Sequence, residues 1–320
     1  MIRSQIIATG SYLPNKVVSN FDLSKIVDTS DEWIIERTGI KNRHIAEDDQ
    51  LTSDLALNAC LKALKNAQIK AQDIEMIVLA STTPDLTFPA TATILQKKLN
   101  ANNAFAFDVQ AVCSGFIYAL NIADNFIRSG QVKNALVVGA ETLSRIVDWK
   151  DRNTCILFGD GAGAVILQAS THKDSGIIAS KLSSDGSLND ILKTSDGVSF
   201  SKKSGFIQMQ GKEVFKHAVE KMVNCVNETL NLANLTISDI DYLVPHQANL
   251  RILKSVSQKL KLTDDQVIIT LANQGNTSAA SIPLALDFAN QNNKFKKNDL
   301  LVLEALGGGL TWGSIIVRWC

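Results

Sequence analysis

The 320-residue chain has no net charge and no long hydrophobic run. Its 32 Lys and Arg residues equal its 32 Asp and Glu residues, so no overall field attracts nucleic acid or an anionic membrane, and an acidic partner would need a local basic patch. The apolar run at the N-terminus is too short for a secretory signal, and no window approaches a membrane-spanning helix. We therefore expect neither a nucleic-acid-binding protein nor a membrane protein.

Cysteine is scarce and scattered. The five cysteines are odd in number and form no Cys-x-x-Cys pair. They are Cys60, Cys113, Cys155, Cys225 and Cys320. This pattern argues against a disulfide framework and against a zinc site, and it predicts a protein of the reducing cytoplasm with no metal.

The sequence contains an internal repeat. Three pairs of segments match: 67–78 with 233–244, 133–138 with 297–302, and 161–167 with 311–317. The offset is about 165 residues in the first two pairs and about 150 in the third, which implies a deletion in the second copy. A repeat of this length indicates duplication of a large α/β unit rather than a solenoid.

Each copy reads strand, helix, strand, helix, strand, then a Gly-rich turn and a last strand. Helices between apolar strands predict mainly parallel sheets that are covered on both faces, and the Gly-rich turns suggest an antiparallel final hairpin. We expect an α/β fold of two duplicated halves, residues 1–172 and 173–320, with mixed sheets. Gly159–Gly163 is predicted to be a tight hairpin, because it lacks the G-x-G-x-x-G spacing and the following helix of a nucleotide site.

Cys113 is the strongest candidate for a reactive side chain. It lies between an apolar strand pattern at 104–109 and a helical pattern at 117–127. The unpaired N–H groups at a helix start would lower the pKa of its thiol and favour a nucleophilic thiolate. In the repeat alignment Asn276 lies in the equivalent strand-to-helix turn, and His246 follows another strand. All three are therefore expected at carboxyl ends of strands, where open α/β sheets carry their sites.

Several motifs occur in a fixed order along the chain. They are Ala-Val-Cys113-Ser-Gly-Phe, Pro-His246-Gln-Ala-Asn249, Gly275-Asn276-Thr-Ser and Gly307-Gly-Gly-Leu-Thr-Trp-Gly313, together with segments 31–40 and 158–163. With these motifs the chain resembles the thiolase superfamily and, more narrowly, the β-ketoacyl-acyl carrier protein synthase III family, from about Ile6 to the C-terminus. The resemblance implies a layered αβαβα thiolase-like fold, a homodimer, and no cofactor besides its substrates.

The resemblance also implies roles for the motif residues. Cys113 would attack an acyl-CoA primer, with a short chain such as acetyl-CoA expected, and release CoA. His246 and Asn276 would donate hydrogen bonds to the thioester oxygen of malonyl-acyl carrier protein as it loses carbon dioxide. The backbone N–H groups of Cys113 and Gly308 would hold the tetrahedral oxyanion. The product would be a β-ketoacyl-acyl carrier protein, which initiates fatty acid synthesis.

A predicted helix that begins after Ser30 and ends before Gly39 carries Trp33 and Arg37 on one face. An indole beside a guanidinium suits the adenine and phosphates of CoA, although a core tryptophan covered by an arginine would give the same spacing. The resemblance favours CoA binding and adds two residues. They are Arg152, stacking on adenine, and Asn249, on the pantetheine arm.

The helix after His246 would bury one face and expose Arg251 and Lys254 on the other. A solvated charged face is the ordinary explanation for such a stripe, but its position beside His246 favours docking of the acidic carrier protein. The resemblance adds Lys216 to this basic patch. It also implies that Phe88 reaches into the acyl pocket of the neighbouring subunit.

Three other functions are compatible with a cysteine, a histidine and an asparagine in one protein. A papain-like Cys-His-Asn hydrolase is disfavoured because its cysteine lies near the chain start in a Cys-Gly-Ser-Cys-Trp context that is missing here. A catalytically inactive acyl-binding protein is disfavoured because all three reactive side chains are present. A related condensing enzyme of secondary metabolism, using another acyl-CoA primer, stays open.

Overall fold

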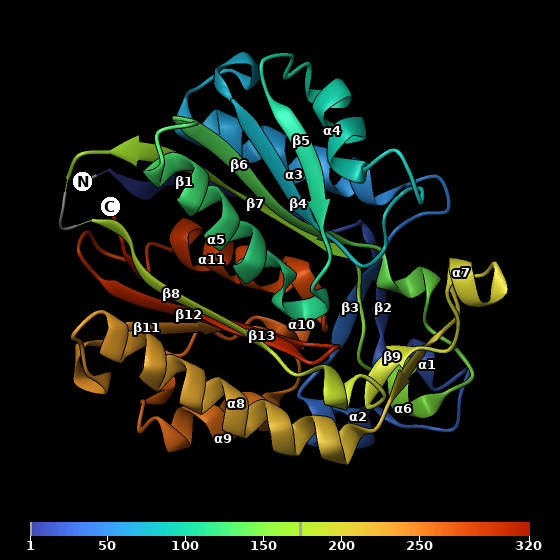
Figure 1. The fold of residues 1–320 in the computed structure, drawn as a ribbon. Helices are drawn as coiled ribbons and strands as arrows, with labels where there is room; N and C mark the ends of the chain where they lie inside the picture. The colour runs from blue at the N-terminus through green and yellow to red at the C-terminus, as the bar shows by residue number, and fades with distance from the viewer. Residues whose placement is uncertain (1, 173–174) are drawn as a thin grey trace.

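A computed structural model describes residues 2–172 and 175–320 of the chain, which form five layers (Figure 1). Two sheets are separated by a central pair of helices, and each sheet is covered on its outer face by a further pair. The central pair is α5 (Gly115–Arg128) and α11 (Ser281–Gln291), and the outer pairs are α3 (Thr52–Ala67) with α4 (Thr91–Leu99) and α8 (Gly211–Leu232) with α9 (Leu250–Lys259). The expected αβαβα layering is confirmed.

The first sheet has the strand order β1-β7-β6-β4-β5. Its strands are β1 (Arg3–Tyr12), β4 (Met76–Ala80), β5 (Phe105–Val109), β6 (Asn134–Glu141) and β7 (Gly161–Ser170). Strand β4 is parallel to β5 and β6, whereas β7 is antiparallel to both of its neighbours. Every residue of β4 is buried, as expected for a strand that helices cover on both faces.

The second sheet repeats this pattern with one strand fewer. Its order is β11-β12-β13-β8, from β8 (Gly176–Ser184), β11 (Tyr242–Pro245), β12 (Leu300–Gly307) and β13 (Thr311–Arg318). The position that would match β5 holds only a single bridge between Leu243 and Val267 in the described part of the chain. The prediction of a full strand at this position of the second copy was therefore wrong.

The shorter elements gather at one end of the molecule (Figure 1). They are β2 (Lys16–Ser19), β3 (Asn42–Ile45), β9 (Leu192–Thr194), β10 (Ile207–Met209), α1 (Asn20–Leu23), α2 (Asp31–Thr38), α6 (Arg152–Cys155), α7 (Val198–Ser201) and α10 (Leu271–Gln274). Residues from several of these elements share a small apolar core that includes Ile34 and Leu253. This core joins α2 to α9.

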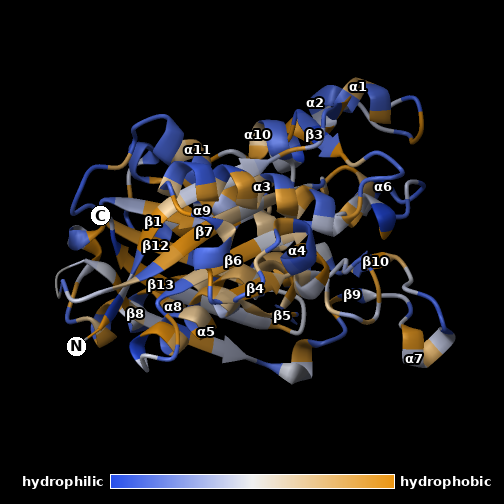
Figure 2. Ribbon diagram, turned by 90° about the horizontal axis from the view of Figure 1, so that it is seen from above, coloured by the Kyte–Doolittle hydropathy of each residue, from blue (hydrophilic) through white to orange (hydrophobic). Residues whose placement is uncertain are grey.

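Three larger apolar cores hold the layers together. The central core packs both sheets against α5 and α11 and includes Phe116, Val165 and Ile315. The two outer cores pack α3 and α4 on the first sheet, and α8 and α9 on the second. Figure 2 shows hydrophobic residues concentrated along the strands and the helices beside them. Burial of this apolar surface is the main driving force that holds the sheets to the helices.

The two halves differ most in the connection between their last two strands. Residues 142–160 join β6 to β7, whereas residues 308–310 join β12 to β13. The tight hairpin predicted at Gly159–Gly163 was therefore wrong, because Gly161 already begins β7 at the end of a long connection. The deletion implied by the sequence offset lies at this point in the second half. The division of the chain at residues 172 and 173 stays a prediction.

Candidate active site

The residues predicted to be reactive line one cavity of about 2080 Å³. Cys113, His246 and Asn276 lie at its inner end with Gly308, and all three side chains are buried. The cavity extends outward to Trp33 and Arg37. Residues from both halves of the chain therefore share one surface. Cys113 and His246 follow β5 and β11, as predicted, but Asn276 follows α10, so its expected position at the end of a strand was wrong.

Two matching turns present the inner end of the cavity. A 3₁₀ turn at Val112–Ser114 leads into α5, and another at Ser278–Ala280 leads into α11. Each begins with a residue in the left-handed region, with φ of 49° at Val112 and 48° at Ser278. A β-branched residue adopts this conformation only when its surroundings enforce it, and such strain is often found at functional sites. The matching turns support the alignment of the two halves.

The thiol of Cys113 is not activated in the way the sequence suggested. Burial raises its pKa to about 12, although the Ser278 hydroxyl opposes the increase, and the Glu141 carboxylate adds a smaller increase. The predicted lowering was wrong. Cys113 lies in the 3₁₀ turn, so α5 begins only at Gly115, and desolvation outweighs the N–H groups around the sulfur. A side chain at Gly307 would place Cβ 2.7 Å from the Cys113 nitrogen, so only glycine permits this approach.

His246 follows β11 directly, and its N–H donates to the Glu304 carbonyl over 2.8 Å. Its Nδ1 lies 2.7 Å from the Ser281 hydroxyl oxygen. Burial lowers the pKa of this histidine to about 3, so the imidazole is neutral at physiological pH. A neutral imidazole donates from one ring nitrogen and accepts at the other, so it can still donate to a substrate.

Asn276 is fixed through its backbone by a segment from the first half. Its N–H donates to the Leu157 carbonyl over 2.8 Å, and its carbonyl accepts from Gly159 N–H over 3.0 Å. Its side-chain Oδ1 accepts from Ser278 N–H over 2.9 Å. That contact leaves the side-chain NH₂ as the group free to donate. The sequence showed the Gly159 motif, but periodicity gave no sign that it supports Asn276.

The outer part of the cavity carries a stacked aromatic group. Ser30 caps α2, and Gly39 ends it in the left-handed region, as predicted. The Trp33 ring is partly buried at the edge of the small core. The guanidinium of Arg37 lies 4.4 Å from the ring centroid and that of Arg152 lies 4.9 Å from it. Two cations thus stack on one indole, an arrangement that a nucleotide base could enter.

Asn249 has a structural role in this conformation. It caps α9, since its side-chain oxygen accepts from Arg251 N–H over 2.8 Å, and its amide donates to the Arg37 carbonyl over 3.1 Å. It also lines the cavity. Asn249 therefore links α9 to α2 beside the cavity.

The predicted basic residues are exposed on the two outer helices of the second sheet. Arg251 and Lys254 on α9 lie at the mouth of the cavity, whereas Lys216 on α8 is exposed but does not line it. Lys212, at the start of α8, does line the cavity and was missed by the sequence analysis. The sequence could have identified Lys212 by its position one helical turn before Lys216 on the same helix. Phe88 is 83% exposed on the loop between β4 and α4.

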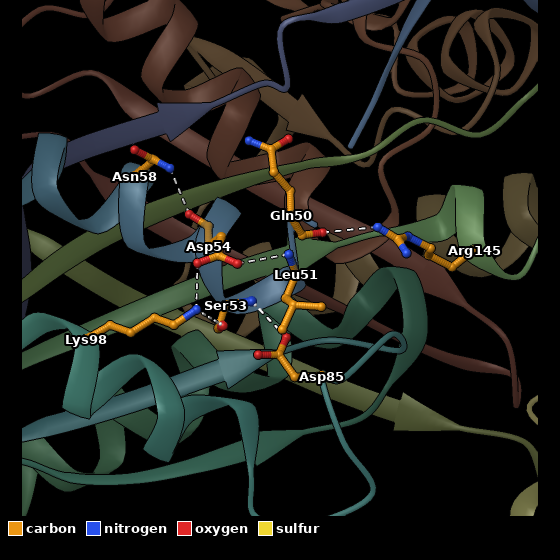
Figure 3. Close-up of polar contacts among 8 residues, drawn as sticks. All are labelled: Gln50, Leu51, Ser53, Asp54, Asn58, Asp85, Lys98 and Arg145. Atoms are coloured by element: carbon orange, nitrogen blue, oxygen red, sulfur yellow. Dashed lines mark hydrogen bonds and ion pairs between the residues drawn. The ribbon is translucent and has the colours of Figure 1, made fainter. Parts of the chain in front are cut away.

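Polar contacts fix the loop that carries Phe88 (Figure 3). Asp85 on this loop accepts from Ser53 N–H at the start of α3 over 2.9 Å. Lys98 on α4 donates to the Ser53 hydroxyl over 2.7 Å, and Arg145 donates to the Gln50 carbonyl over 3.3 Å. Leu86 and Thr87 on the same loop line the cavity, so the contact between Asp85 and Ser53 stabilises one of its walls, while the other two contacts hold the start of α3 beside it.

No helix in residues 2–172 and 175–320 is long and apolar enough to cross a membrane. Among the same residues, no cluster of three or more His, Cys, Asp or Glu side chains could hold a metal ion.

Comparisons with known proteins identify the family of this chain. Residues 107–186 match the family model for 3-oxoacyl-[acyl-carrier-protein] synthase III, and residues 230–319 match the model for its C-terminal part. The chain is 56% identical to the β-ketoacyl-[acyl-carrier-protein] synthase III of Ehrlichia canis, over 99% of this chain and all of that protein. It superposes on the 3-oxoacyl-[acyl-carrier-protein] synthase III of Aquifex aeolicus with a TM-score of 0.95, at 47% identity over 99% and 100% of the two chains.

A third relative is the priming β-ketosynthase of a polyketide biosynthetic pathway, with a TM-score of 0.94 and 33% identity over 99% and 96% of the two chains. The duplicated fold, with a cysteine, a histidine and an asparagine in one cavity, defines a thiolase-like condensing enzyme. More particularly, the chain belongs to the β-ketoacyl-[acyl-carrier-protein] synthase III family, acyltransferases that perform the initiating condensation of fatty acid synthesis. The resemblance seen in the sequence is confirmed, and the papain-like alternative is excluded.

Proposed function

We propose that this protein condenses a short acyl-CoA primer, such as acetyl-CoA, with malonyl-acyl carrier protein to give a β-ketoacyl-acyl carrier protein. It acts as a cytoplasmic homodimer and needs no cofactor. The convergence of Cys113, His246 and Asn276 in one cavity, with a stacked tryptophan at its outer part, is the observation that carries the proposal.

The first half-reaction is a thiol exchange. The sulfur of Cys113 attacks the thioester carbon, a Cys113 thioester forms, and the bond to the CoA sulfur breaks. The Cys113 thiol loses one proton and the departing CoA thiolate gains one, so the exchange needs no net proton. A buried thiol with a raised pKa fits such a balanced exchange. The tetrahedral oxyanion is held by the backbone N–H groups of Cys113 and Gly308, both of which lie at the inner end of the cavity.

The second half-reaction forms the carbon–carbon bond. Malonyl-acyl carrier protein loses carbon dioxide, and the electron pair of the broken bond moves to the thioester as an enolate. His246 and Asn276 donate hydrogen bonds to the enolate oxygen, and donors that are already oriented need no reorganisation. The enolate carbon attacks the acyl group and forms the new carbon–carbon bond, the bond to the Cys113 sulfur breaks, and the departing thiolate takes one proton from solvent. The neutral state of His246 and the contact from Ser278 to Asn276 support this division of roles.

Single variants of the three residues test the proposal. Cys113→Ser abolishes acylation, because an unactivated hydroxyl is a far poorer nucleophile than a thiolate. His246→Ala and Asn276→Ala still take label from radioactive acetyl-CoA but do not condense. Cys320→Ser, which alters an exposed thiol, is the control and acts as wild type. Loss of acylation with intact malonyl decarboxylation in either the histidine or the asparagine variant would show the roles to be wrong.

The primer decides between fatty acid synthesis and the alternative in secondary metabolism, which the similarity to a polyketide priming enzyme keeps open. Purified protein is assayed with acetyl-, isobutyryl- and octanoyl-CoA beside malonyl-acyl carrier protein. A clear preference for acetyl-CoA supports the proposal, and a preference for the other primers favours the alternative.

A further inference from the structure

Ser281 is the first residue of α11, and its side chain contacts the imidazole of His246. It is 1% exposed. Its Oγ is 2.7 Å from His246 Nδ1 and 3.3 Å from the backbone nitrogen of Gln247. These are the two hydrogen-bond contacts of the Ser281 side chain within the described residues.

The direction of both contacts follows from the groups involved. The backbone N–H of Gln247 can only donate, so the Ser281 oxygen is the acceptor in that contact. The hydroxyl proton of Ser281 has no other acceptor among the described residues, so donation to His246 Nδ1 is the arrangement that leaves no buried donor unsatisfied. A neutral imidazole that accepts at Nδ1 carries its own proton on Nε2. The ring therefore presents an N–H donor on the side away from Ser281.

The backbone at Gln247 is itself held in place. Its side-chain NH₂ donates to the carbonyls of Pro245 over 2.8 Å and of Ile268 over 3.0 Å. Its side-chain oxygen accepts from Thr270 N–H over 2.9 Å. All these groups are buried, so each lost contact would leave an unsatisfied polar atom. The Gln247 N–H is thus fixed toward Ser281, and the hydroxyl cannot easily reverse its direction.

We propose that Ser281 is a positioning residue that holds His246 in the Nε2–H tautomer, so that the imidazole meets the enolate oxygen as a hydrogen-bond donor. This inference rests on the proposed function of His246. It explains how one histidine can serve decarboxylation without acting as a base toward Cys113: the nitrogen on the substrate side already holds a proton.

Ser281→Ala tests the inference in the full-length protein. The acylation of Cys113 by acetyl-CoA stays near the wild-type rate and reports that the variant is folded. Condensation with malonyl-acyl carrier protein falls by up to roughly a hundredfold, the size expected when a catalytic group loses its orientation. Ser257→Ala, which removes another buried serine hydroxyl at a position on α9 that does not line the cavity, is the matched control and leaves both steps unchanged.

Nitrogen NMR of ¹⁵N-labelled histidine gives a readout that a purely structural role would not move. In the wild type the His246 signals show a protonated Nε2 and an unprotonated Nδ1, and in Ser281→Ala they show a mixture of tautomers. If Ser281→Ala does not fold, Ser281→Cys carries the test, because its thiol is similar in size and a weaker donor. Unchanged His246 signals in a folded variant would overturn the inference.

A double-mutant comparison separates the inference from the function it rests on. In a His246→Ala background, Ser281→Ala causes no further loss of the residual malonyl decarboxylation, because Ser281 acts only through the imidazole. If His246→Ala alone condensed normally, the proposed function of His246 would fail whatever Ser281 does. If His246→Ala failed to condense but adding Ser281→Ala lowered malonyl decarboxylation again, Ser281 would act by another route and the inference would be wrong.

Discussion

Individual buried residues decide the chemistry of this site. Cys113 and His246 are both held in their neutral forms because burial penalises charge: the pKa of the acid is raised and that of the base is lowered. The sequence predicted which side chains meet, since they follow strands with a recognisable apolar pattern. It could not predict their pKa values, because desolvation depends on how residues from several distant segments close around each group.

Glu304 shows the same effect outside the proposed chemistry. It lies on β12, is fully buried, and neither carboxylate oxygen has a hydrogen-bond partner among the described residues. Burial raises its pKa to about 8. Between about pH 4.5 and 8 the folded protein therefore keeps this carboxyl protonated, whereas the unfolded chain has released the proton, because its carboxyl has the ordinary pKa near 4.5. The free energy of unfolding consequently falls as the pH rises through this range.

We expect Glu304→Gln to remove this dependence. The amide keeps the shape of a protonated carboxyl but cannot ionise. The free energy of unfolding of the variant should therefore rise relative to that of the wild type by up to about 1.4 kcal/mol for each pH unit in that window. Urea unfolding of both proteins at several pH values between 5 and 9 measures the difference. A difference in unfolding free energy that stays constant with pH would contradict the expected ionisation.

At the level of elements, the sequence predicted those with strong local signals. Ser30 and Gly39 mark the ends of α2, and the apolar stripe with Leu253 and Val256 marks the buried face of α9. The predictions of two elements were wrong for the same physical reason. The strand expected near Val267 and the hairpin expected at Gly159 depend on long-range pairing, which no local pattern specifies. The support of Asn276 by residues 157–159 was missed on the same ground.

The exposed end of α2 gives a prediction about CoA. Trp33→Ala removes the stacking platform, which costs about 1–3 kcal/mol for a nucleic acid base. The apparent constant for acetyl-CoA should then rise roughly ten- to a hundredfold, at about 1.4 kcal/mol per tenfold. A short acyl-pantetheine thioester lacks the nucleotide and should be unaffected, as steady-state kinetics with both substrates will measure. An equal loss with both would mean that Trp33 supports the fold rather than the nucleotide.

The exposed face of α9 gives a prediction about the carrier protein. Replacing Arg251 and Lys254 by Glu should lower kcat/KM for malonyl-acyl carrier protein, because exposed charges steer association. It should also make kcat/KM depend less on ionic strength, because salt screens such charges. The matched control reverses Lys259 and Lys261, which lie at the other end of the same helix region and do not line the cavity. Acylation by acetyl-CoA should stay near the wild-type rate in both variants. A similar effect from both pairs would indicate general charge rather than a docking face.

At the level of the whole molecule, the first sheet ends in an unpaired edge. Strand β5 is the last strand in its order, and Phe105 on it is 43% exposed. Phe88, on the neighbouring loop, is more exposed still. An exposed edge strand with aromatic residues favours pairing with another chain. We propose that the homodimer forms along β5 and that Phe88 of one subunit reaches toward the acyl cavity of the other.

Mixed dimers test whether Phe88 acts across the interface. Phe88→Ala should enlarge the acyl pocket and shift primer preference toward longer acyl-CoA, because a large side chain no longer fills it. In a dimer of one Phe88→Ala subunit and one Cys113→Ala subunit, the single working cysteine receives an intact Phe88 from its partner. Its preference among acetyl-, butyryl- and octanoyl-CoA should therefore match the wild type, although its own chain carries the substitution. If the mixed dimer instead shows the longer preference of the Phe88→Ala homodimer, Phe88 shapes the pocket of its own subunit and the expected contact across the interface does not exist.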